Sequence, residues 1–126
     1  MRRIPTLALA ISLVALTPAH AHHSFAIFDQ TKIATIEGTV KEVQWTNPHI
    51  WLQITVPTAD GGTEEWGIEG GPLSQLKERG LKKDLLHAGD KVVVKANPLR
   101  NGERGGSLIS ISRTDGTVIF GEPGGR

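Results

Sequence analysis

The sequence has no cysteine, no tyrosine and a single methionine, the initiator, among its 126 residues. The missing cysteines exclude a disulfide scaffold, a cysteine nucleophile and thiolate sites for zinc or iron–sulfur clusters. The missing tyrosines exclude a tyrosine base, and without an internal methionine there is no thioether site for copper(I). Five histidines, thirteen carboxylates and a few hydroxyl groups therefore remain as the groups that can carry chemistry.

An excess of charge of one sign is also missing, since 14 Lys and Arg residues face 13 Asp and Glu residues. Nucleic-acid binding depends on clustered cations, because its affinity comes largely from counterion release. The one basic stretch, residues 77–83, is interrupted by Glu78 and followed by Asp84. We therefore expect no nucleic-acid partner. The length and the apolar fraction of 38% predict one folded domain.

Residues 1–21 have the three parts of a secretory signal peptide. Arg2 and Arg3 are followed by an apolar run at 7–16 and by Ala-His-Ala at 19–21. This pattern predicts cleavage after residue 21, a periplasmic location and no stable membrane span after cleavage. An N-terminal anchor that is never cut is the alternative, but an apolar run of about ten residues is shorter than the roughly 20 that span a bilayer.

Cleavage changes the charge of the chain. Removing 21 of the 126 residues leaves 105, and losing Arg2 and Arg3 leaves 12 basic against 13 acidic residues, a net charge of −1. We expect residues 22–126 to form one domain, with an N-terminal extension at 22–32 and a flexible tail at 121–126. The slightly basic balance of the whole chain thus belongs to the export signal.

Alternating apolar residues predict most of the mature chain to be β-strand. In the first strand the apolar phase switches between Val40 and Val43, which predicts a β-bulge or strong bend. Asp60-Gly61-Gly62 predicts a hairpin turn, and Gly105-Gly106 is interpreted as part of a hairpin loop. The expected strands are 35–45, 50–56, 64–69, 91–97, 107–113 and 117–120.

A helix is expected between the third and fourth strands, at 72–79. Pro72 suits its first turn and Gly80 its C-terminal end. Three strands, a helix and further strands are the element order of the OB-fold. The fold class expected is therefore mainly β, a small OB-like barrel of five to six strands with one helix between strands 3 and 4. An open β-sandwich with one helix is the competing fold.

Four motifs together resemble a known family. They are His-His-Ser-Phe-Ala at 22–26, Gly-Thr-Val at 38–40, Trp-x-Asn-Pro-His at 45–49 and Gly-Asp-x-Val at 89–92. In these motifs the chain resembles domain-of-unknown-function family 6152, a bacterial family of small exported proteins. The resemblance covers essentially all 105 mature residues. It implies an exported protein with no assigned reaction, ligand or catalytic residue.

Three histidines are candidate metal ligands: His22, His23 and His49. Cleavage after residue 21 would give His22 a free α-amine, which can chelate a metal together with the imidazole Nδ1. His49 would add a third nitrogen, or His23 a different chelate, and such nitrogen sites favour copper(II) first and zinc second. The alternative is that His22 and His23 belong to a solvated terminus and that His49 only hydrogen-bonds a carbonyl. His87 is interpreted as a turn cap.

Trp45, Asn47 and Trp51 are the candidate residues of a ligand groove, because the face of strands 2 and 3 binds ligands in OB barrels. Trp66 is interpreted as a packing residue. Since the chain has no tyrosine, packing is an alternative for Trp45 and Trp51 too.

No enzyme signature is present. Ser24 follows two histidines, but there is no Gly-x-Ser-x-Gly elbow. The leading hypothesis is a non-enzymatic periplasmic binding module, with copper(II) held by the mature N-terminus and the Asn-Pro-His turn. A structural or protein-interaction module with an apolar Trp-lined surface is the second hypothesis, and a small metal-dependent enzyme at the same site is the third. A small ligand or a periplasmic protein is the expected partner.

Overall fold

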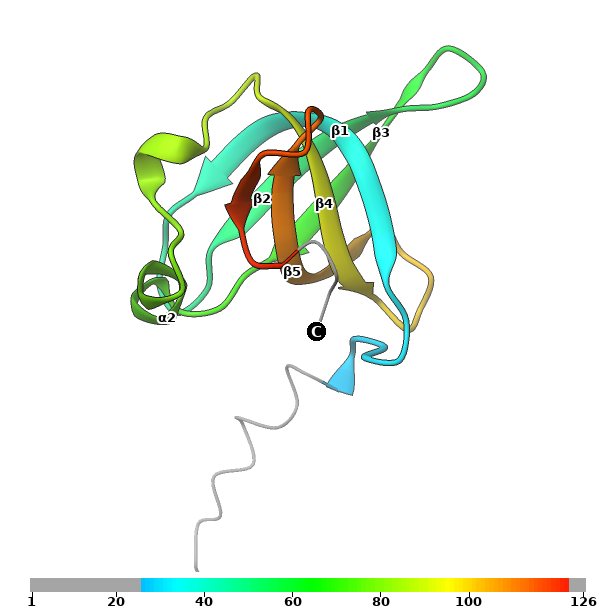
Figure 1. The fold of residues 1–126 in the computed structure, drawn as a ribbon. Helices are drawn as coiled ribbons and strands as arrows, with labels where there is room; N and C mark the ends of the chain where they lie inside the picture. The colour runs from blue at the N-terminus through cyan, green and yellow to red at the C-terminus, as the bar shows by residue number, and fades with distance from the viewer. Residues whose placement is uncertain (1–25, 123–126) are drawn as a thin grey trace, which may run out of the picture.

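The computed structural model describes residues 26–122 (Figure 1), so the expected signal peptide, His22, His23 and residues 123–126 lie outside the described residues. The described elements are β1 (Ala34–Gln44), β2 (Trp51–Pro57), β3 (Thr63–Glu69), α2 (Leu73–Glu78), the 3₁₀ turn η1 (Lys83–Leu85), β4 (Lys91–Pro98), β5 (Gly105–Arg113) and β6 (Val118–Phe120). Within residues 26–122, no helix has the length and apolar character to cross a membrane.

Five of the strands close into a barrel. The strand order is β3-β2-β1-β4-β5-β6, with neighbours antiparallel. A short parallel pairing of β3 with β5, from Gly67↔Gly105 to Glu69↔Ser107, joins the two ends of the five-stranded sheet. With α2 between β3 and β4, this is the topology of an OB-like barrel. The expected fold class is confirmed, and the competing open sandwich is wrong.

A β-bulge in β1 allows that strand to serve two partners. Its first half pairs with β4 and its second half with β2, and the register with β2 shifts between Val40 and Glu42. The predicted bulge is confirmed, and it lies where the apolar phase of the sequence changes. The bulge adds local bend and twist, which a long strand needs in order to curl around a small barrel.

The barrel interior is filled by aliphatic side chains from alternate strand positions, with Leu52, Ile54, Ile68, Val92, Val94 and Ile111 fully buried. Leu76 of α2 is buried against this core, as are Leu81 and Leu86 of the following segment, whereas Leu85 is exposed. The helix follows Pro72 and ends before Gly80, whose φ of 99° lies in the left-handed region that glycine adopts without strain. The predicted helix is confirmed.

Gly105 and Gly106 correct one sequence expectation. They were expected in a hairpin loop, but they begin β5 and are buried. A Cβ atom on Gly106 would lie 2.7 Å from the Asn97 carbonyl oxygen, and one on Gly105 would lie 2.7 Å from a methyl carbon of Leu99. The glycines are therefore explained by the close approach of neighbouring chain at the barrel closure, and turn chemistry is not involved.

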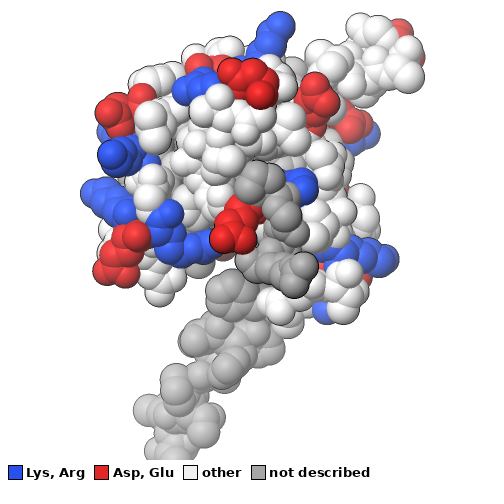
Figure 2. All heavy atoms as spheres, in the orientation of Figure 1, with Lys and Arg blue, Asp and Glu red and all other residues white. Residues whose placement is uncertain are grey.

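Charged side chains of both signs are interspersed on the face of the molecule drawn in Figure 2. Elsewhere on the described surface, opposite charges pair, as Lys41 does with Glu65 and Arg104 with Glu64. The face drawn in Figure 2 therefore has no patch of one sign.

Candidate functional site

The start of the described chain is tied to the end of β4. The Ile27 carbonyl accepts a hydrogen bond from the Arg100 N–H at 2.8 Å, and the Asp29 N–H donates to the Pro98 carbonyl at 2.8 Å. Phe28 forms an isolated bridge with Leu99 and is buried. This part of the expected N-terminal extension therefore lies along the chain that leads from β4 to β5.

The segment between β1 and β2 is fixed against the start of α2. Its Asn47–Pro48 peptide bond is cis. The Asn47 Oδ1 accepts a hydrogen bond from the Leu73 N–H at 3.3 Å, and the Thr46 hydroxyl donates to the His49 carbonyl at 2.9 Å. These contacts hold the backbone on both sides of His49 and so set the direction of its ring.

One ring nitrogen of His49 meets two acceptors. Its Nδ1 lies 3.1 Å from the Gly70 carbonyl oxygen and 3.2 Å from Oε1 of Glu69. Both partners accept hydrogen bonds, so the neutral ring carries its proton on Nδ1 and leaves the lone pair on Nε2. Among the described residues the structure records no partner for Nε2. His49 therefore presents an acceptor nitrogen, and its side chain is 30% exposed.

A cavity of about 180 Å³, here called the His49 cavity, lies beside this ring. Phe28 and Ser107 line it together with His49 and Glu69, and so does Arg79, whose guanidinium lies 4.9 Å from the centroid of the Phe120 ring. Phe28 is two residues from the start of the described chain. The His49 cavity thus lies next to the point at which the N-terminal residues join the barrel.

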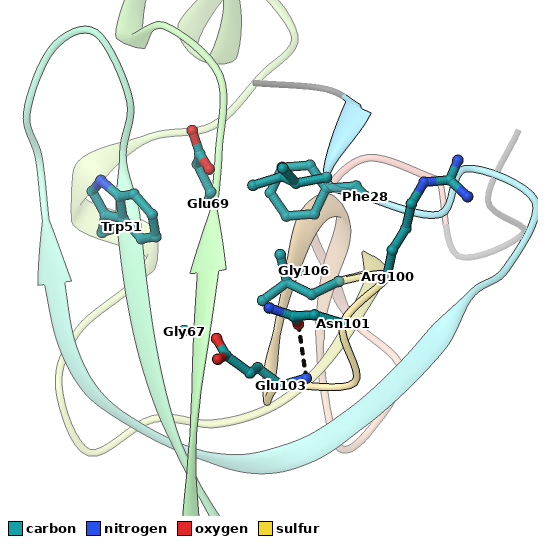
Figure 3. Close-up of a pocket in the computed structure, with 10 residues that line it drawn as sticks. Phe28, Trp51, Gly67, Glu69, Arg100, Asn101, Glu103 and Gly106 are labelled. Atoms are coloured by element: carbon teal, nitrogen blue, oxygen red, sulfur yellow. Dashed lines mark hydrogen bonds between the residues drawn. The ribbon is translucent and has the colours of Figure 1, made fainter. Parts of the chain in front are cut away.

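A second cavity, here called the Trp51 cavity, adjoins the first and has a volume of about 390 Å³. It shares Phe28 and Glu69 with the His49 cavity. Figure 3 shows Trp51 of β2 on one side of it, Phe28 on the other side, and Gly67 with the Glu103 carboxylate between them. Trp51 is 42% exposed to solvent, a large fraction for a tryptophan, which is the largest of the apolar residue types.

The candidate groove residues do not gather in one place. Trp51 lines the Trp51 cavity, whereas Trp45 packs partly buried against the core and lines a different hollow beside His87. Asn47 contacts the start of α2 through its side chain. Trp66 packs against the core, as expected, and its indole N–H donates to Glu64 at 3.0 Å.

Of the candidate metal ligands, His49 is the one that the structure describes. Within residues 26–122, no group of three or more His, Cys, Asp or Glu side chains could hold a metal ion. A metal site with three such ligands that includes His49 would therefore take at least one of them from outside residues 26–122. His87, interpreted as a turn cap, lies 4.0 Å from Asp90 through its ring, and its backbone N–H donates to the same carboxylate at 2.9 Å.

Glu69 is the site residue that the sequence interpretation missed. Nothing in its residue type or its place in the sequence linked it to His49. Register arithmetic could have found it, because residues equally distant from Asp60 face each other across the β2–β3 hairpin. Trp51 and Glu69 are such a pair, so the end of β3 lies beside the segment that carries His49.

Comparison with known proteins gives one family and one fold neighbour. A family model described as "Family of unknown function (DUF6152)" matches residues 10–109. No curated protein matches the chain. Among solved structures, the mitochondrial single-stranded DNA binding protein Rim1 of S. cerevisiae is similar, with a TM-score of 0.49 and 15% sequence identity over 66% of this chain and 94% of that chain.

Proposed function

The chain belongs to DUF6152, a family of unknown function, and we propose that it is an exported, non-enzymatic binding module for copper(II). In this proposal His22, at the N-terminus freed by cleavage after residue 21, supplies its α-amine and imidazole. His49 supplies the third nitrogen through Nε2. His23 is the alternative second ligand from the same terminus, and zinc is the second metal.

The orientation of the His49 ring is the observation that carries the proposal. Histidines that bind metals usually donate their other ring N–H to a carboxylate or a backbone carbonyl, which fixes the tautomer and raises the basicity of the ligating nitrogen. Here Nδ1 has both kinds of acceptor, Glu69 and the Gly70 carbonyl. The His49 ring is therefore already in the tautomer that a metal requires, with the lone pair of Nε2 free.

Chain length supports the second step of the proposal. His22 is six residues before Phe28, and six residues span at most about 20 Å. Phe28 and His49 line the same cavity. The mature N-terminus is consequently within reach of His49, and an amine with two imidazoles is a donor set that suits tetragonal copper(II).

A copper(II) titration of four proteins tests this proposal. The first is the chain beginning at His22, and the second is the same chain with its α-amine acetylated, which removes the amine–imidazole chelate. The third is the His49→Ala variant of the first, and the fourth is His87→Ala, a matched control that removes an exposed histidine at another place. We expect acetylation and His49→Ala each to weaken binding at least about tenfold, and His87→Ala to leave it unchanged.

Copper(II) spectra of the same four proteins identify the ligand set. A nitrogen-rich tetragonal spectrum in the first protein should lose one nitrogen in His49→Ala. Equal and weak binding by all four proteins would contradict the proposal. So would tight binding that requires the free N-terminus and ignores His49, because the barrel would then contribute no ligand.

A further inference from the structure

Gly67 is a glycine that the fold does not require. It lies inside β3, and its φ is outside the positive range that several turn glycines adopt. A Cβ atom on Gly67 would have no atom within 4 Å, whereas a Cβ on Gly38 would lie 2.3 Å from the Thr55 carbonyl oxygen. Glycine inside a strand weakens it, because the unfolded chain has more freedom and no side chain packs. Neither turn geometry nor crowding therefore explains Gly67.

The absent side chain of Gly67 keeps the Trp51 cavity open. Gly67 lies two residues before Glu69, so both face the same side of β3, and Glu69 pairs with Trp51 on β2. Figure 3 shows the Glu103 carboxylate directed toward Gly67. A larger residue at this position would fill the space between Trp51 and Glu103.

The charged groups around this space are mainly negative. Glu69 and Glu103 both line the Trp51 cavity, and among residues 26–122 the structure records no ion pair for Glu103. Arg100 also lines it, but its Nε donates to the Ala26 carbonyl at 3.0 Å and its guanidinium points away from the cavity (Figure 3). Arg104 is paired with Glu64 at 2.8 Å. Two carboxylates and an exposed indole thus border the open space above Gly67.

We propose that the Trp51 cavity binds a small organic cation, an ammonium group on a compact apolar body. An indole attracts a cation to its face, and nearby carboxylates strengthen that attraction. Phe28 and Leu99 supply apolar surface for the body of the ligand. The volume of about 390 Å³ is in the range of small-molecule sites. This site goes beyond the proposed function: Trp51, Gly67 and Glu103 take no part in the proposed copper site, and Glu69 is the carboxylate that the two sites share.

An NMR titration of the mature protein with three probes of one carbon skeleton tests the proposal. The probes are phenethylammonium, neutral 2-phenylethanol and anionic phenylacetate. The indole N–H signal of Trp51 is the readout, and the Trp66 indole is an internal control because it donates to Glu64. We expect a saturable shift of the Trp51 signal with phenethylammonium, and binding at least about tenfold weaker for the other two probes.

Three variants separate this site from a general effect of charge or stability. Gly67→Val should abolish the shift and leave the urea midpoint of unfolding unchanged or raised. Glu103→Gln should weaken binding about fivefold or more, since a carboxylate near a bound cation is lost. Glu37→Gln removes an exposed glutamate of β1 outside the cavity and should have no effect.

Equal binding of the three probes would overturn the proposal. Retained binding in Gly67→Val, or no saturable shift with any probe, would overturn it as well. The copper(II) binding of the proposed function is measured in a separate titration, and the variant expected to weaken it is His49→Ala. A failure of one proposal therefore leaves the other to be judged by its own variants.

Discussion

In Figure 1, the β2–β3 and β5–β6 turns and the turn before β4 lie at the upper end of the barrel, whereas α2 and the start of the described chain lie at the lower end. The His49 cavity and the Trp51 cavity, both lined by Phe28, open beside these lower segments. The upper turns, here called the turn end, contain Asp60, Asp90 and Asp115. Each of these carboxylates accepts a backbone N–H within its own turn. The lower end, here called the cavity end, carries Trp51 and His49.

The difference between the two ends indicates that the residues of the cavity end are not all explained by folding stability. At the turn end, each aspartate carboxylate is satisfied by a hydrogen bond inside its own turn, and the hollows nearby are more open to solvent than the His49 and Trp51 cavities. At the cavity end, Nε2 of His49 has no partner among the described residues, and Trp51 is 42% exposed to solvent. Gly67 places no side chain on its face of β3, and a Cβ atom there would meet no other atom. Binding residues are expected in regions of this second kind, because their groups are held for a ligand.

The largest expected effect comes from placing the same methyl group at two glycines. Gly38→Ala puts a Cβ atom 2.3 Å from the Thr55 carbonyl oxygen, so the backbone must move, and we expect a loss of about 3 kcal/mol in the free energy of unfolding. Gly67→Ala meets no atom and should leave this free energy unchanged or slightly raised. Urea unfolding of both variants measures the contrast, and equal losses would remove the distinction between crowded and open glycines.

Two tryptophans give the next contrast. Trp66 packs against the core, so Trp66→Ala should cost about 2 kcal/mol of unfolding free energy. Trp51 is exposed at the cavity end, and Trp51→Ala should cost less than about 1 kcal/mol. Thermal unfolding of the two variants is the measurement. A larger cost at Trp51 would mean that this indole is a structural residue.

The smallest expected effect is on the stability of the protein in acid, through the aspartates of the turn end. The Thr58 hydroxyl and then the Gly62 N–H hold the pKa of Asp60 below its ordinary value, and the Thr117 N–H and hydroxyl do the same for the pKa of Asp115. Because these pKa values are lower in the folded chain, their stabilisation is present above the ordinary aspartate pKa of 3.8 and is lost as the pH falls through the lowered values.

The double variant Asp60→Asn, Asp115→Asn should therefore show a shallower fall of the melting temperature between pH 5 and pH 2 than the original chain. Asp84→Asn is the matched control, because Asp84 lies in the exposed turn η1 and no described residue donates a hydrogen bond to its carboxylate. An unchanged slope in the double variant would show that these turns contribute nothing to acid stability.

Much of the barrel could be predicted from local sequence. The bulge at Val40 followed from a change of apolar phase, and α2 followed from Pro72 and Gly80, because these features act within a few residues. The position of barrel closure could not be predicted in the same way. Gly105 and Gly106 are typical of turns in sequence, and their pairing with β3 depends on chain almost 40 residues away.

The candidate site shows the same limit. His49 and Trp51 were predicted as candidate residues, since histidine and tryptophan are informative by type. The contact of His49 with Glu69 depends on the β2–β3 register and on the segment that leads into α2, so residue type alone did not reveal it. The open space above Gly67 could not be predicted either, because the sequence does not show which atoms surround a glycine.

The central claim is that the cavity end is the binding end, and paramagnetic broadening by copper(II) tests it most directly. A substoichiometric amount of copper(II) is added to the ¹⁵N-labelled chain that begins at His22, and amide signals are followed by NMR. The claim predicts that Gly70 and Gly71, beside the His49 ring, broaden first while Gly61 and Gly116 in the aspartate turns stay sharp. Equal broadening at both ends, or broadening confined to the turn end, would contradict it.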